Sequence, residues 1–206
     1  SSAMTTPKLV NRTDWRPEFD AYEPTLVRAQ ANAIDMVSEM ESDSNPRWLT
    51  LVGCCGCGKT MLAQQLFIQS QKTNPGAKPL WISGNGFYSQ YNRRPRCVWL
   101  TANTFADRMR SGEYDLPEYL SNDYFVVIDD IGTTRDKTDF VADGLYRLCN
   151  SRMGKWTVFT TNLSLPEISD RVDERVASRM IRDGNQVVKI TAKDYALKTL
   201  VSNINP

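Results

Sequence analysis

The octapeptide Gly53-Cys54-Cys55-Gly56-Cys57-Gly58-Lys59-Thr60 decides the fold of this chain, because it matches the phosphate-binding pattern G-x-x-x-x-G-K-[ST]. An apolar run at residues 48–52 precedes it and predicts a strand. The run at residues 61–67 follows it with the spacing of an amphipathic helix. Glycines in such a loop let successive backbone N–H groups turn toward an anion. Strand, loop and helix together predict a nucleoside triphosphate site.

Each part of this segment has an expected role. Lys59 would reach the β- and γ-phosphates of ATP, and the Thr60 hydroxyl would be a ligand of Mg²⁺. The helix that begins near Lys59 would direct its positive end at the phosphates. The residues predicted to contact the nucleotide are Gly53, Cys54, Cys55, Gly56, Cys57, Gly58, Lys59, Thr60 and Met61.

Three of the five cysteines, Cys54, Cys55 and Cys57, lie inside this loop. A zinc site would need a fourth ligand, and Cys97 and Cys149 have no spaced pairing that supplies one. We therefore interpret the three as small residues of a phosphate loop in a reducing compartment. Oxidation of their thiols is expected to block nucleotide binding.

Composition limits the class of protein. A chain of 206 residues supports one sizeable α/β domain. Its net charge of +1 excludes the global basic footprint of an obligate nucleic-acid binder, and the absence of histidine excludes imidazole catalysis and His-ligated metals. No apolar run approaches the length of about 18 residues that a membrane helix needs, and no signal peptide opens the chain. We expect a soluble, cytoplasmic protein without a membrane partner.

Strands and helices alternate along the chain. Residues 1–45 are expected to form an arm and a helix, with a cloning scar at residues 1–3, and residues 46–206 the ATPase domain. The expected strands are residues 48–52, 97–102, 124–128, 156–161 and 186–191, and the main helices are residues 24–40, 61–67, 104–110, 140–152 and 170–182. This alternation predicts an α/β fold with a mostly parallel five-stranded sheet and helices on both faces.

Polar residues follow two of these strands. The run at residues 124–128 ends in Asp129 and Asp130, and we expect its strand to lie beside the loop strand. Asp129 would hold Mg²⁺, and Asp130 would orient the attacking water. A solvated acidic turn is the alternative. Asn162, after residues 156–161, could contact the γ-phosphate or cap the turn that follows it.

Arg175 and Arg179 stand four residues apart, on one face of a predicted helix. They could form surface ion pairs with Asp173 or Glu174. They could instead enter the nucleotide site of a neighbouring subunit as an arginine finger, which accelerates hydrolysis by roughly 10³- to 10⁵-fold.

Residues 87–96 combine three aromatic residues with three arginines, the side chains that bind single-stranded nucleic acid without sequence preference. A loop whose aromatics cover the sheet edge is the alternative. Arg108, Arg110 and Arg182 are further candidates for DNA contact. Binding to single strands is expected to be weak, salt-sensitive and stronger with ATP.

These motifs together resemble the AAA+ ATPases of the DnaC/DnaI helicase-loader and IstB transposition-helper group. The resemblance covers residues 48 to about 191 and rests on residues 53–60, 126–132, 160–164 and 174–180. It implies a P-loop NTPase three-layer sandwich without a C-terminal helical lid domain. It also implies that Asn162 is the sensor residue and that Arg179 is the arginine finger, with Arg175 as the second choice. The helix at residues 104–110 would match the insertion by which this clade stacks and tracks single-stranded DNA.

The resemblance implies an ATP- and Mg²⁺-dependent ATPase with a low intrinsic rate that self-association stimulates. Its expected role is to load a replicative DNA helicase, with single-stranded or double-stranded DNA as a further partner. A transposition helper that recruits a transposase to DNA is the alternative, since the first 45 residues are too few for a full helicase-gripping domain. A P-loop small-molecule kinase is the rival from another class. The Asp129-Asp130 pair and Asn162 argue against it, because kinases need no second carboxylate that orients water.

Overall fold

The computed structural model describes residues 23–82, 95–132 and 139–194. A six-stranded sheet in the order β2-β3-β4-β5-β1-β6 forms its centre, and every strand pairing is parallel. The strands are β1 (Trp48–Gly53), β2 (Lys78–Trp81), β3 (Arg96–Thr101), β4 (Phe125–Ile131), β5 (Trp156–Thr161) and β6 (Gln186–Ile190). The α/β class is confirmed, whereas the predicted count of five strands is wrong.

The additional strand is β2, at the edge of the sheet beside β3. Its register pairs Lys78 with Arg96 and Trp81 with Trp99. Its four residues carry Pro79 at the second position and contain no fully buried side chain. Proline is tolerated on an edge strand, where one row of N–H groups needs no partner. A short strand without an apolar run gives no sequence signal, so this region appeared irregular.

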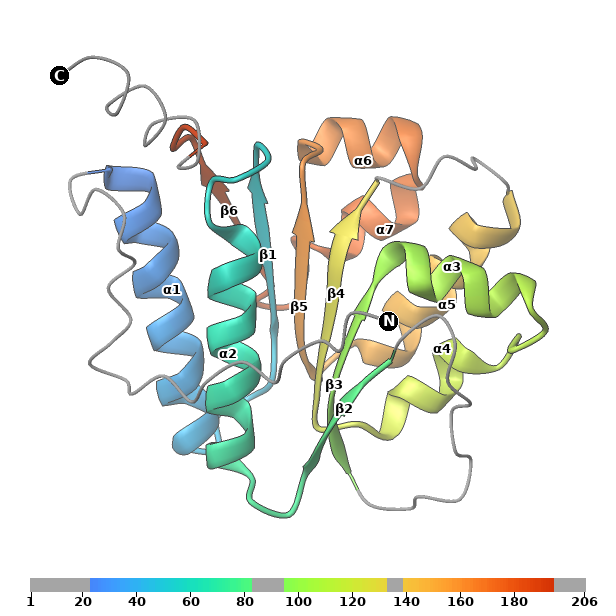
Figure 1. The fold of residues 1–206 in the computed structure, drawn as a ribbon, viewed down its shortest axis with the longest axis horizontal. Coiled ribbons are helices and arrows are strands. Elements are labelled where there is room, and N and C mark those ends of the chain that lie inside the picture. The colour runs from blue at the N-terminus through green and yellow to red at the C-terminus, as the bar shows by residue number, and fades with distance from the viewer. Residues whose placement is uncertain (1–22, 83–94, 133–138, 195–206) are drawn as a thin grey trace, which may run out of the picture.

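Helices cover both faces of the sheet and give three layers (Figure 1). One face carries α1 (Pro24–Glu41) and α2 (Lys59–Thr73). The other face carries α3 (Ala102–Arg110), α4 (Leu116–Tyr119), a 3₁₀ turn η2 (Leu120–Asn122), α5 (Asp139–Arg152), α6 (Leu165–Arg171) and α7 (Glu174–Arg179). None of the helices in the described ranges is both long and apolar enough to cross a membrane.

Two hydrophobic clusters hold the layers together, one on each face of the sheet. Successive residues of a strand point to opposite faces, so Val127 joins the first cluster while Val126 joins the second. All six residues of β1 and of β5 are buried. This burial on both sides explains the continuous apolar runs by which the sequence predicts these strands.

The predicted helix over residues 170–182 is two helices. Asp173 interrupts it with extended backbone, and its side chain accepts a hydrogen bond from the Arg175 N–H as the N-cap of α7. α6 begins earlier, after Ser164, whose side chain and that of Glu167 form a capping box. The short α7 is thereby a separate element, which packs against α5 and α6.

The first and last described segments of the chain lie side by side. The Thr191 N–H, just after β6, donates a 2.9 Å hydrogen bond to Oγ1 of Thr25 in the first turn of α1. α1 also packs against α2 and β6 and belongs to the first cluster (Figure 1). Within the described residues no lid helix follows β6. The division into an arm and a domain at residue 45 stays a prediction.

Candidate nucleotide-binding and hydrolysis site

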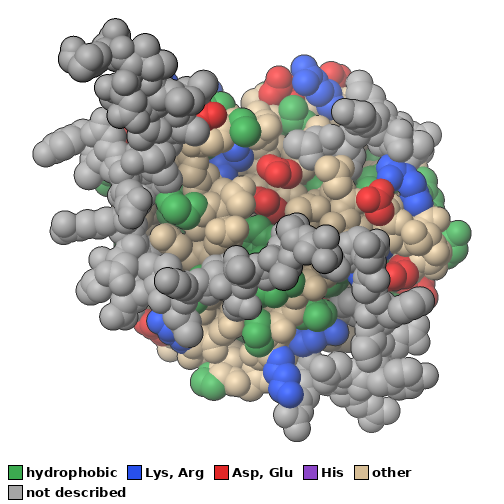
Figure 2. All heavy atoms as spheres, viewed as in Figure 1, with side chains coloured by type: hydrophobic (Ala, Val, Ile, Leu, Met, Phe, Trp, Pro, Cys, Tyr) green, Lys and Arg blue, Asp and Glu red, His purple; other side chains and the backbone are tan. Residues whose placement is uncertain are grey.

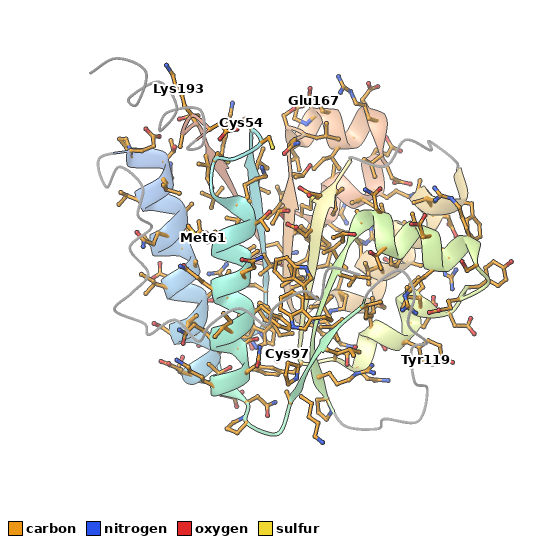
Figure 3. The ribbon with its side chains drawn as sticks, viewed as in Figure 1. Cys54, Met61, Cys97, Tyr119, Glu167 and Lys193 are labelled. Atoms are coloured by element: carbon orange, nitrogen blue, oxygen red, sulfur yellow. The ribbon has the colours of Figure 1, made fainter. Side chains whose placement is uncertain are left out.

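The phosphate loop connects the end of β1 to the start of α2 (Figure 3). Gly56 and Gly58 have φ angles of 72° and 103°, in the left-handed region that glycine adopts without strain. Gly58 is the N-cap of α2 and provides no capping side chain. The N–H groups of the first helical turn are therefore left for another acceptor, the arrangement that binds phosphate at a helix start.

The chain beyond β6 lies against this loop, a contact that the sequence did not predict. A Cβ atom placed on Gly53 would lie 2.7 Å from the Ile190 carbonyl oxygen. One placed on Gly56 would lie 2.4 Å from an Asp194 carboxylate oxygen. Cys54 Sγ donates to the Ala192 carbonyl at 3.3 Å. Figure 3 likewise shows Cys54 and Lys193 at the same edge of the sheet, so both glycines also serve close packing.

Lys59 is buried, with 4% of its surface exposed. Its Nζ donates a 2.7 Å hydrogen bond to the Cys54 carbonyl, which holds the ammonium within the curve of the loop. Cys57 is buried beside it, and burial raises the pKa of its thiol. Cys54 and Cys55 are exposed. Within the described ranges, no group of three or more His, Cys, Asp or Glu side chains could hold a metal ion.

Asp129 links the loop to the sheet. Its Oδ1 accepts hydrogen bonds from Thr60 Oγ1 at 3.1 Å and from Thr160 Oγ1 at 2.5 Å. Only 5% of Asp129 is exposed, and burial raises the pKa of its carboxyl group, because removal from water disfavours the charged form. A cation beside this carboxylate would restore its charge. The hydroxyl of Thr60 and the carboxylate of Asp129 are oxygen ligands that fit Mg²⁺.

Thr160 is the residue that the sequence analysis missed. We expected the Asp129 strand to lie beside the loop strand, but β5 separates β4 from β1. Thr160 of β5 spans this gap, because its hydroxyl donates to Asp129 and accepts a 2.8 Å hydrogen bond from the Asp130 N–H. The available signal was a pair of threonines, Thr160 and Thr161, at the carboxyl end of a strand that is buried throughout.

Asp130 has a φ angle of 61°, which is uncommon for a residue with a side chain. The register between β4 and β5 shifts between Ile128 and Ile131, so the strand bulges at this point. Such a conformation costs about 1–3 kcal/mol and persists only where its surroundings hold it. The half-buried Asp130 thereby takes a position distinct from that of the buried Asp129. Figure 2 shows acidic side chains next to a basic one in the middle of the molecular surface seen in that view.

Comparison with known proteins gives matches to structures only, since no family model and no curated protein matches the chain. The DnaC helicase loader aligns with a TM-score of 0.56 and 20% identity, over 79% of this chain and 90% of its own. DnaI aligns with a TM-score of 0.60 and 15% identity, over 89% and 88%. Domain III of the Thermotoga maritima replication initiation protein DnaA aligns with a TM-score of 0.64 and 19% identity, over 92% and 72%. The chain therefore shares the fold of these three replication proteins.

Asn162 occupies an exposed position at the end of β5. It directly follows this strand, which lies between β1 and β4. The alternative role as a cap is wrong, because Ser164 caps α6 and the Leu163 N–H is bonded to Thr161 Oγ1. The backbone of Asn162 thus follows the strand that lies between β1 and β4, and its role as a sensor of the γ-phosphate stays a prediction.

Arg175 and Arg179 have their hydrogen-bonding partners on α5 and around α7. Arg175 forms an ion pair with Asp173, from Nη2 to Oδ2 at 2.7 Å, as the surface alternative predicted. Arg179 instead donates from Nε to Asn150 Oδ1 at 2.8 Å and from Nη2 to Tyr146 Oη at 3.3 Å. Arg179 forms no ion pair with any carboxylate of the described residues.

Two of the arginines expected to contact DNA are buried in the fold. Arg96 forms an ion pair with Asp123 at 2.8 Å, and Arg108 forms one with Glu113 at 2.8 Å. Both predictions are wrong, because these side chains are buried and form ion pairs inside the fold, Arg96 at the start of β3 and Arg108 on α3. Arg110 pairs with Asp107 at the surface, and Arg182 is exposed. Most of the segment 87–96 lies outside the described residues.

Replacing Asp130 with asparagine tests the role of the second carboxylate. Asp130→Asn should retain ATP binding and lose hydrolysis by about 10²- to 10⁴-fold, the usual contribution of a general base. Asparagine also tolerates a positive φ, so the backbone should remain unchanged. ATP affinity and phosphate release would be measured in parallel.

Asp43→Asn is the matched control, since Asp43 has a φ of 52° and lies exposed between α1 and β1. Hydrolysis at the normal rate by Asp130→Asn would remove Asp130 from the mechanism.

The exposed thiols of Cys54 and Cys55 should make nucleotide binding sensitive to peroxide. Oxidation adds polar, charged groups to a loop that must approach phosphate closely. ATP affinity measured before and after peroxide treatment should fall. A variant with both Cys54→Ser and Cys55→Ser should resist, because burial raises the pKa of Cys97 to about 11 and that of Cys149 to about 12, which leaves little reactive thiolate there. Equal ATP affinity before and after treatment would contradict the prediction.

Proposed function

We propose that this chain is an ATP-hydrolysing AAA+ assembly factor that loads a replicative DNA helicase. The observation that carries the proposal is the bonding of Asp129 to both Thr60 of the phosphate loop and Thr160 of β5. This bonding joins a triphosphate loop to a buried carboxylate, the two halves of an ATPase site. The second carboxylate, that of Asp130, favours hydrolysis over phosphoryl transfer to a small molecule, because a kinase needs no carboxylate that orients water.

Each residue has a role in this proposal. The loop N–H groups and Lys59 bind the phosphates, while Thr60 and Asp129 hold Mg²⁺. Bound Mg²⁺ would neutralise charge on the β- and γ-phosphates. Asp130 orients the attacking water, and Asn162 contacts the γ-phosphate or that water.

The remaining component is supplied by a neighbouring subunit. Arg179 is the proposed arginine finger, because its guanidinium is hydrogen-bonded to neutral groups while that of Arg175 is paired with Asp173. A positive charge that no described carboxylate neutralises can compensate charge that develops on a phosphate. Hydrolysis should therefore be slow in the monomer and faster after self-association.

The proposed partners follow from the structural neighbours. The DnaC helicase loader matches this chain over 90% of its own length. A replication initiator DnaA bound to AMPPCP and single-stranded DNA aligns with a TM-score of 0.57 and 18% identity, and this match spans 51% of that protein. These likenesses support a replicative helicase and single-stranded DNA as partners of this chain.

Phosphate release with and without single-stranded DNA, over a range of protein concentrations, tests the proposal. The specific rate should rise with protein concentration, and DNA binding should strengthen with ATP and weaken with salt. Adding a replicative helicase should shift the ATP-bound protein into a larger complex. ATP consumption without phosphate release would instead identify a kinase. Stimulation by a transposase but not by a helicase would favour transposition.

A further inference from the structure

Tyr146 forms a platform on α5 for both arginines of α7. The Cζ atom of Arg175 lies 3.9 Å from the ring centroid, and that of Arg179 lies 4.6 Å from it. The ring is half-buried and packs against the second hydrophobic cluster, so its orientation is fixed by the core. A cation within about 6 Å of an aromatic ring face is attracted by the ring quadrupole.

The hydrogen bonds add direction to this attraction. Asn150, one turn along α5 from Tyr146, accepts from Arg179 Nε at 2.8 Å, and the phenol oxygen accepts from Nη2 at 3.3 Å. The hydrogen bond from Asn150 and the positive charge of Arg179 lower the pKa of the Tyr146 phenol. Nη1 donates to the Arg175 carbonyl at 3.5 Å, so all three guanidinium nitrogens have neutral acceptors. Among the described residues, no carboxylate pairs with the charge of Arg179.

We propose that Tyr146 and Asn150 are positioning residues, which hold the Arg179 guanidinium in the orientation that enters the neighbouring subunit's nucleotide site. This inference rests on the proposed function of Arg179 as a finger. A free arginine loses much rotamer entropy when it is fixed, and an arginine that is already ordered loses less. We call Tyr146 and Asn150 together the cradle of Arg179. The cradle therefore lowers the barrier to hydrolysis in the assembled protein, although it does not contact ATP.

Single substitutions test separately what the ring and the hydroxyl of Tyr146 contribute to hydrolysis. Tyr146→Leu should lower kcat of the assembled protein by about 5- to 30-fold, with an unchanged KM for ATP, because the cation–π contact is lost. Tyr146→Phe should retain most of kcat, since it keeps the ring. Asn150→Ala, at an exposed position where folding is not at risk, should lower kcat in the same way. Tyr114→Leu is the matched control, because Tyr114 is 55% exposed and contacts Phe140 instead.

Mixed assemblies show on which subunit the cradle acts. Tyr146→Leu subunits keep an intact phosphate loop, and Lys59→Ala subunits keep an intact cradle and finger. Mixing the two proteins should restore hydrolysis above the sum of the separate rates, because the second supplies a positioned Arg179 to the ATP of the first. A defect confined to the folding of Tyr146→Leu would not be restored in this way.

The outcomes distinguish this inference from the proposed function. If Arg179→Ala abolishes stimulated hydrolysis while Tyr146→Leu and Asn150→Ala behave as the control, the cradle is overturned and the finger stands. If Arg179→Ala keeps full assembled activity, the finger and the cradle both fail. A fall in kcat that Lys59→Ala subunits do not restore would also overturn the positioning role.

Discussion

Substitution of Arg179 by alanine is expected to lower the hydrolysis rate of the assembled protein by about 10³- to 10⁵-fold. The guanidinium would no longer compensate the charge that spreads over the γ-phosphate oxygens in the transition state. The rate should be measured as phosphate release at protein concentrations that span the assembly transition. ATP affinity should remain unchanged, because Arg179 lies outside the phosphate loop of its own chain.

Arg171→Ala is the matched control for this experiment. Arg171 is an exposed arginine of the neighbouring helix α6 and forms a 3.6 Å surface ion pair with Glu167. Surface pairs of this kind contribute about 0–1 kcal/mol to stability. Its removal should leave both folding and hydrolysis intact. Full activity of assembled Arg179→Ala would move the finger assignment to Arg175 or abolish it.

Lys59→Ala should weaken ATP binding by about a hundredfold or more. The charge-assisted hydrogen bonds of the ammonium to the β- and γ-phosphates would be lost, each worth about 1.5–3 kcal/mol. The loop would also lose the 2.7 Å bond from Nζ to the Cys54 carbonyl, which braces it. Calorimetric titration with ATP and Mg²⁺ would measure the change.

Lys72→Ala provides the comparison for Lys59→Ala. Lys72 is exposed in the last turn of the same helix, far from the loop. Its removal should leave ATP affinity unchanged, whereas a general effect of lost positive charge would lower both affinities. Unchanged affinity in Lys59→Ala would mean that the loop does not bind the triphosphate as we propose.

The sequence sufficed for the parts of the fold that local chemistry encodes. The phosphate loop has a fixed spacing, and the continuous apolar run before Asp129 is typical of a strand buried on both faces. It failed for β2, whose exposed residues carry no pattern, and for the order of the strands. Periodicity predicts that a strand exists and leaves its neighbours undefined.

In the site, too, the sequence predicts the residues of local motifs and misses those whose role depends on contacts distant in the chain. Thr160 was missed because its importance lies in contacts with Asp129 and Asp130, about thirty residues away. Arg96 and Arg108 were misassigned since a single sequence does not distinguish an arginine paired in the interior from one at the surface. The cradle of Arg179 likewise depends on α5 and α7 packing side by side.

The hydrogen bond between Thr25 and Thr191 has a practical consequence for handling the protein. It brings the first and last described segments of the chain together at the edge that carries the phosphate loop, as Figure 1 shows. A bulky label attached at Thr25 or Thr191 would stand at the edge that carries the loop, where it is expected to hinder nucleotide entry. Immobilisation through the turn at Gly154, between α5 and β5, would instead leave that edge facing the solution.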